Sequence, residues 1–165
     1  MRVMPHILLA FLAIGLQRGL GPLLTVGAAR LDLVMIAAAF SATCFPRVTG
    51  PLVALAIGLA YDFAGAGPIG LHAVAFGVAG LIASNVPTNR WGRLLATLVA
   101  SIVVASMLFW VLGLLRWGFN DDPSPAGHGF LGMLGTILLT GLFAVALSLP
   151  LWKWRRVFLV EDNRF

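Results

Sequence analysis

Charged residues are scarce in this sequence. Only 10% of its 165 residues are Asp, Glu, Lys or Arg, whereas 60% are hydrophobic. Soluble domains contain about 25% charged residues, so this chain lacks the side chains that would cover a water-facing surface. The composition therefore predicts a single domain that lies entirely in a membrane, an all-α integral membrane protein.

Cysteine and the usual catalytic patterns are also lacking. Cys44 is the only cysteine, which excludes an internal disulfide. The three histidines, His6, His72 and His128, do not have the spacing of a metal site. No phosphate-binding glycine loop, Ser-His-Asp set or pair of catalytic carboxylates can be assembled. We therefore expect a protein that is not an enzyme and that has neither a cofactor nor a metal ion.

The sequence has no large basic cluster, although its net charge is +5. Lys and Arg stand singly at the ends of apolar runs, as orientation in a membrane requires, so we expect no nucleic-acid partner. With the N-terminus inside, the outer side holds only Arg30 and Arg116, and the inner side holds Arg2, Arg47, Arg90, Arg93, Lys153, Arg155, Arg156 and Arg164. This asymmetry predicts that both termini are cytoplasmic.

What the sequence does contain is a series of six apolar runs. They predict six transmembrane helices in a single bundle, at about residues 6–24, 31–45, 48–64, 69–86, 94–115 and 130–151. The second and third runs are short for a hydrocarbon core of about 30 Å. A re-entrant hairpin over residues 31–64 is therefore an alternative to two full spans.

A glycine-rich turn joins the third run to the fourth, and a carboxylate precedes it. Asp62 lies in apolar surroundings, and the turn contains Gly65, Pro68 and Gly70 before the next run opens with His72. Pro68 stops a continuing helix, and glycine permits a positive φ, so the pattern predicts helix, tight turn, helix. A carboxylate in a bilayer is costly unless it has a partner, water or a function.

One basic residue, Arg18, also falls inside a predicted helix. Arg18 and Asp62 each lie about 12 residues along a helix that runs outward, so both are expected at a similar depth of ~18 Å. One hypothesis is an ion pair between them. The alternative is that Arg18 extends towards the outer surface while Asp62 accepts backbone N–H groups of the glycine turn.

Small residues recur every three or four positions in three of the predicted helices. Such stripes allow close approach of helix backbones, either within the bundle or with a partner helix. The candidate packing or partner residues are Gly58, Gly77, Gly80, Gly132, Thr136 and Ala144. The fifth run has apolar residues around most of its circumference, including Leu94, Leu98 and Ile102, so we expect it to face lipid.

The stretch from Gly58 to Ala73 resembles the signature of the rod shape-determining protein MreD family. Leu16-Gln17 and Asp32 also fit, whereas Leu31 stands where the family has proline. The chain length, the six-helix layout and the short basic tail match as well. The matching residues of the central stretch are Gly58, Leu59, Asp62, Gly65, Pro68, Gly70, Leu71, His72 and Ala73.

The resemblance implies a non-enzymatic subunit of the bacterial elongation machinery in the inner membrane. Such a subunit binds MreC, a protein with one transmembrane helix, and through it connects to MreB filaments, RodZ, and RodA with its penicillin-binding partner. The family is also similar in fold to the substrate-binding subunits of energy-coupling vitamin transporters. The alternative function is therefore capture of a small molecule or lipid-linked precursor, with Arg18, Asp32, Tyr61, Asp62 and His72 as the candidate polar residues.

Overall fold

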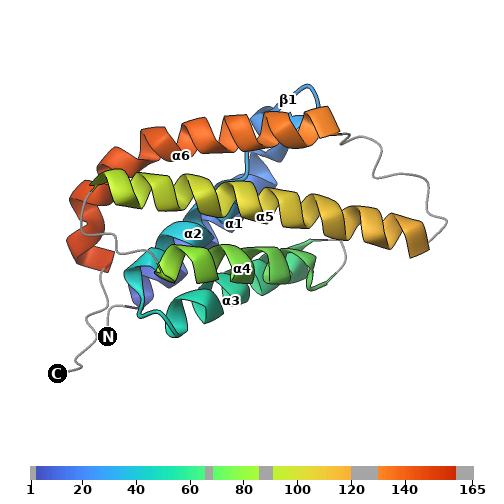
Figure 1. The fold of residues 1–165 in the computed structure, drawn as a ribbon. Coiled ribbons are helices and arrows are strands. Elements are labelled where there is room, and N and C mark those ends of the chain that lie inside the picture. Colours follow the sequence, from blue (N-terminus) through green and yellow to red (C-terminus); the bar gives the residue numbers. More distant parts are fainter. Residues whose placement is uncertain (1–2, 66–68, 86–90, 120–129, 159–165) are drawn as a thin grey trace.

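The structure, a computed structural model, describes residues 3–65, 69–85, 91–119 and 130–158. Within these ranges the chain is mostly helical, as predicted, and forms six α-helices that run back and forth in one bundle (Figure 1). The helices are α1 (Met4–Gly19), α2 (Leu33–Cys44), α3 (Thr49–Ala64), α4 (Leu71–Asn85), α5 (Trp91–Phe119) and α6 (Phe130–Phe158).

The largest departure from the predicted boundaries follows α1. The predicted helix continues to residue 24, but α1 ends at Gly19 and is followed by a 3₁₀ turn, η1 (Gly21–Leu24). A short antiparallel hairpin comes next, in which β1 (Thr25–Val26) pairs with β2 (Ala29–Arg30) and Gly27 has φ +60°. Glycine and proline at the end of α1 weaken the α-helix. The residues that follow are also apolar, so the sequence pattern predicted a helix that is too long.

Helix α2 lies at the centre of the bundle and packs against α1, α3, α4, α5 and α6 (Figure 1). Ten of its residues are buried, and Val34, Ala39 and Phe40 have no exposed surface. Its 12 residues correspond to about 18 Å of helical rise, too short for a ~30 Å hydrocarbon core. Because other helices surround it, α2 is a core helix of the protein.

Helices α3 and α4 approach each other closely along their small-residue stripes. A Cβ atom at Gly58 would lie 2.6 Å from the carbonyl oxygen of His72 and 2.7 Å from the Cα of Ala73. A Cβ at Gly80 would lie 2.6 Å from the Cβ of Ala54, whereas one at Gly77 would make only ordinary contacts with Leu55. Gly58 and Gly80 are therefore occupied by packing within the chain and offer no surface to a partner helix.

The hairpin and the segment after it pack against the small-residue stripe of α6. A Cβ at Gly132 would lie 3.1 Å from the carbonyl oxygen of Ala28. Thr136 Oγ1 accepts a hydrogen bond from the backbone N–H of Arg30 (3.0 Å), and Ala144 is fully buried. The small residues Gly132 and Thr136 thus allow the backbone of the hairpin to pack directly on α6.

The expectation that the fifth run faces lipid is wrong for the face that carries Leu94, Leu98 and Ile102. Leu94, Leu98 and Ile102 lie on one face of α5 and are at most 1% exposed, because this face packs against the rest of the bundle. Met107 and Val111 are exposed. A helix that is apolar on all sides does not reveal from its sequence which side is covered by protein.

Two segments, Leu94–Leu112 of α5 and Leu131–Lys153 of α6, are long and apolar enough to cross a membrane by length and composition. The helices α2, α3 and α4 are apolar but shorter. Large apolar side chains are exposed on α1 and α6, among them Leu8, Phe11, Leu138 and Leu142, each more than 70% exposed. Pro150 lies inside α6, which changes direction near its C-terminal end (Figure 1).

Candidate functional site

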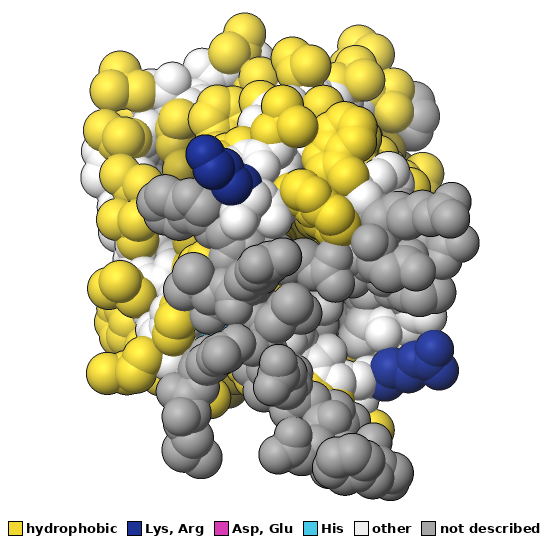
Figure 2. Space-filling model, turned by 90° about the vertical axis from the view of Figure 1, so that its left-hand side faces the viewer, with side chains coloured by type: hydrophobic (Ala, Val, Ile, Leu, Met, Phe, Trp, Pro, Cys, Tyr) yellow, Lys and Arg dark blue, Asp and Glu magenta, His cyan; other side chains and the backbone are white. Residues whose placement is uncertain are grey.

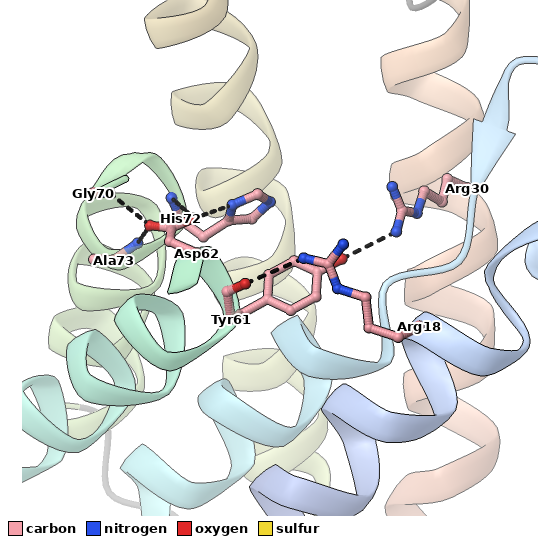
Figure 3. A network of polar contacts seen from close by, with 7 residues as sticks. All are labelled: Arg18, Arg30, Tyr61, Asp62, Gly70, His72 and Ala73. Atoms are coloured by element: carbon pink, nitrogen blue, oxygen red, sulfur yellow. Dashed lines mark hydrogen bonds and ion pairs between the residues drawn. The ribbon is translucent and has the colours of Figure 1, made fainter. Parts of the chain in front are cut away.

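Asp62, in the last turn of α3, binds the first turn of α4. Its Oδ2 accepts hydrogen bonds from the backbone N–H groups of Gly70 (2.8 Å) and Ala73 (3.2 Å). Its Oδ1 accepts a longer bond from the N–H of His72 (3.4 Å). The carboxylate therefore bridges the two helices at the turn that joins them (Figure 3).

The start of α4 needs such an acceptor. The first bond within α4 runs from Val74 N–H to the carbonyl oxygen of Gly70 (3.0 Å), so the preceding N–H groups have no partner inside the helix. A side chain of Ser, Thr, Asp or Asn at the N-cap usually accepts from them, but Gly70 has none. Gly70 adopts φ +97°, which favours glycine, and Asp62 supplies the missing acceptor from α3. A negative charge there also interacts favourably with the helix dipole.

The ring of His72 is held by the same carboxylate. Its Nδ1 lies 2.6 Å from Asp62 Oδ1, and an ionised carboxylate can only accept, so Nδ1 is the donor. The imidazole also lies edge-to-face on Tyr61, with ring centroids 4.7 Å apart, and contacts Phe76 at 5.7 Å. These contacts fix the position of the ring between α3 and α4.

Arg18 does not pair with Asp62, so the ion-pair hypothesis is wrong. Its Nη2 instead donates to the carbonyl oxygen of Tyr61 (3.3 Å), and its Cζ lies 4.9 Å from the centroid of the Tyr61 ring. The Tyr61 carbonyl belongs to the last turn of α3, where carbonyl groups lack helical partners and the helix dipole favours a cation. The two charges therefore interact with opposite helix ends rather than with each other.

Gly65 makes room for this arrangement. The guanidinium group of Arg18 lies directly where a Cβ at Gly65 would be. Any side chain at that position would displace the arginine from the end of α3. Of the predicted turn residues, Gly65 and Gly70 thus have separate steric roles, while Pro68 lies outside the described residues.

Arg30, which the sequence placed only among the outer basic residues, reaches the same tyrosine. Its Nη2 donates to the Tyr61 hydroxyl group (3.0 Å), so two arginines approach Tyr61 from α1 and from β2 (Figure 3). Tyr61 itself is only 4% exposed. No pattern in the sequence indicated that Arg30 and Tyr61 meet, because the hairpin that carries Arg30 was not predicted.

Asp32 belongs to a neighbouring structure at the start of α2. Its Oδ1 accepts from the N–H of Met35 (2.9 Å), which makes it the N-cap, and its own N–H donates to Thr140 Oγ1 (3.1 Å). Gln17, which is 1% exposed, also holds this turn: its Nε2 donates to the Leu31 carbonyl and its Oε1 accepts from Leu33 N–H, both at 2.8 Å. Gln17 was recognised only as part of the family resemblance, although an amide in an apolar run is itself a signal of a buried hydrogen-bonding role.

Among the residues that the structure describes, no group of His, Cys, Asp or Glu side chains could hold a metal ion. The side chains around Tyr61 instead form hydrogen bonds with backbone groups at the ends of α3 and α4, and they include two guanidinium groups. The remaining candidate packing residues, Gly132, Thr136 and Ala144, lie on α6 and serve the hairpin and core contacts described above.

The structural role of Asp62 predicts a ranking of two carboxylate removals. Asp62→Ala leaves three backbone N–H groups and an imidazole without their acceptor, and should lower the free energy of unfolding by about 3 kcal/mol or more. Asp32→Ala removes one capping bond and should cost about 1 kcal/mol. Denaturant unfolding in detergent micelles measures both losses. Equal losses, or a smaller loss for Asp62→Ala, would contradict the bridging role.

Comparison with known proteins identifies no relative: no protein-family model, curated protein or solved structure matches this chain. The resemblance to the MreD family is therefore a prediction from the sequence alone, based on the central motif, the helix layout and the basic tail.

Proposed function

We propose that this chain is a non-enzymatic, multi-pass adaptor of the bacterial inner membrane, of the MreD type. In this role it binds a single-helix partner of the MreC type. Through that partner it contributes to the elongation of the cell wall, with MreB filaments, RodZ, RodA and the penicillin-binding partner of RodA as indirect associates.

The observation that carries this proposal is the division between inner and outer surfaces. The motif residues Asp62, Gly65 and Gly70 serve the geometry of the α3–α4 turn, and Gly58 and Gly80 serve the packing of these helices. The exposed sides of α1 and α6 are instead lined by large apolar residues. This combination suits a protein that acts through lateral contacts in a bilayer.

Helix α1 offers the surface best suited to another helix. Gly15 and Gly19 are exposed, and a Cβ at either position would have no neighbour within 4 Å. Phe11 and Leu8 lie on the same side of the helix, one and two turns before Gly15, and are also exposed. Glycines spaced by four residues allow two transmembrane helices to approach closely. Unlike Gly58 and Gly80, these glycines are not used inside the chain.

Charge supports an orientation in which the turn between α2 and α3 is cytoplasmic. Figure 2 views the end of the bundle where α1 begins and α6 ends, and the charged side chains visible among its described residues are Lys or Arg. Hydrophobic side chains cover much of the described surface in this view. A basic end of an apolar bundle is expected on the cytoplasmic side. In this arrangement all six helices lie within the membrane, with α2 enclosed by the others.

Opposite ends of the bundle should react from opposite sides of the membrane. Val48 and Val26 are both exposed, and they lie at the α2–α3 turn and in the hairpin. In a Cys44→Ser background, Val26→Cys should label in intact spheroplasts with an impermeant maleimide. Val48→Cys should label only after the membrane is opened. Labelling of both positions in intact spheroplasts would contradict the proposed topology.

Partner binding should depend on the glycines of α1. Gly15→Leu with Gly19→Leu fills open space, so the fold should persist while close approach of a partner helix is blocked. We expect co-purification with the co-expressed MreC-type protein of the same organism to fall about tenfold or more, which corresponds to the loss of ~1.4 kcal/mol or more of binding free energy.

Gly141→Leu is the matched control, since a Cβ at Gly141 on α6 also has no neighbour within 4 Å. It should retain the partner. If the doubly substituted protein binds as the wild type does, the α1 surface is wrong. If the wild type binds no single-helix protein but retains a small molecule, the adaptor role itself is wrong and the transporter-like alternative replaces it.

A further inference from the structure

Two guanidinium groups meet at Tyr61 without a carboxylate partner. The one ion pair among the described residues joins His72 and Asp62, and neither Arg18 nor Arg30 takes part in it. Asp62 is engaged by α4, and the Oδ1 of Asp32 caps α2. The two nearby carboxylates are thus bound to helix ends. Arg30 interacts electrostatically with Asp32, but neither arginine forms an ion pair with a carboxylate among the described residues.

Most hydrogen-bond donors of the two arginine side chains have no acceptor among the described residues. A guanidinium group has five N–H donors. The side chains of Arg18 and Arg30 each donate one bond within the described residues, and both bonds go to Tyr61. Arg18 is exposed and Arg30 is half-buried, so an external acceptor can reach them.

Tyr61 adds a donor of its own. Its hydroxyl oxygen accepts the bond from Arg30, and its O–H has no acceptor among the residues that the structure describes. The side chain is 4% exposed and is held by the His72 ring and by the Arg18 guanidinium group. A buried O–H beside two unpaired cations favours an anionic acceptor at this position.

The depth of the cluster strengthens the demand for an anion. The N–H of Arg30 binds Thr136, which follows Leu131, the start of the apolar segment of α6, by five residues. This distance corresponds to about 8 Å of helical rise. In the proposed membrane location, a cation at that level lies at or below the boundary between lipid headgroups and hydrocarbon, where an unpaired charge is costly.

From this geometry we infer that Arg18, Arg30 and the Tyr61 hydroxyl group form a binding site for a phosphate group. Phosphate oxygens accept charge-assisted bonds from guanidinium forks, often two at a time, and the Tyr61 O–H supplies a further donor. The phosphate can belong to a lipid headgroup or come from solution. The site rests on the proposed membrane location but not on the adaptor role, because it requires neither a protein partner nor cell-wall synthesis.

Binding of lipid to the purified chain tests the site. Native mass spectrometry from detergent micelles would compare phosphatidylglycerol with diacylglycerol of the same acyl chains, which lacks the phosphate. The wild type should bind phosphatidylglycerol about tenfold or more tightly than diacylglycerol. Arg18→Gln with Arg30→Gln should abolish most of this preference. The matched control is Arg47→Gln, because Arg47 is exposed at the opposite end of the bundle, and it should leave the preference unchanged.

Two further measurements complete the test. Tyr61→Phe keeps the ring beneath Arg18 and removes only the hydroxyl group, so it should weaken phosphatidylglycerol binding by about threefold or more without unfolding the chain. If the arginine variants fail to fold, the Tyr61→Phe variant alone tests whether the phosphate site exists. Inorganic phosphate at millimolar concentration shows whether the bound phosphate comes from lipid or from solution. If it displaces the lipid, and raises the melting temperature of the wild type but not of the arginine variants, the site takes phosphate from solution. Equal binding of the two lipids, with no effect of inorganic phosphate, would overturn the site, as would unchanged binding by Tyr61→Phe and by every folded arginine variant.

Discussion

The hydrogen bonds from Asp62 to the start of α4 are the interaction on which the rest of this structure depends. A helix that begins in apolar surroundings has N–H groups that water does not reach, and they must be satisfied by other groups of the protein. Asp62 does this from the last turn of α3, so the ends of the two helices are held together. Their close contact at Gly58 and Gly80 follows, because the helices can approach only where side chains are absent.

The same solution recurs at the end of α3 and at the start of α2. Arg18 from α1 binds a carbonyl group in the last turn of α3, and Asp32, Gln17 and Thr140 satisfy the backbone before and at the start of α2. At each of these three helix ends, at least one side chain from another element completes the hydrogen bonding. This explains how α2, with 12 residues, can lie inside an apolar bundle without spanning it. It also leaves Arg18 and Arg30 without carboxylate partners, which is the basis of the inferred phosphate site.

The sequence predicted the helical architecture well because long apolar runs mark helices whatever surrounds them. It did not predict the hairpin after α1, because residues 20–31 are nearly as apolar as the helix before them. The Arg18 side chain does reach the last turn of α3, where Asp62 lies, but the partners of the two charges depend on the rotation of each helix, which the sequence leaves open. The buried face of α5 escaped prediction for a related reason, whereas packing of Gly58 within the bundle was one of the two expected alternatives. Lipid and protein interior are both apolar, so periodicity does not separate the two faces.

The inferred phosphate site requires a rigid arrangement around Tyr61, and the bridge made by Asp62 supplies it. Amide hydrogen exchange at the start of α4 tests that bridge most directly, because the N–H groups of Gly70, His72 and Ala73 have no acceptor within their own helix. In detergent or nanodiscs, these three amides should exchange as slowly as amides in the middle of α4. Exchange at the rate of unprotected amides, while the middle of α4 stays protected, would contradict the account.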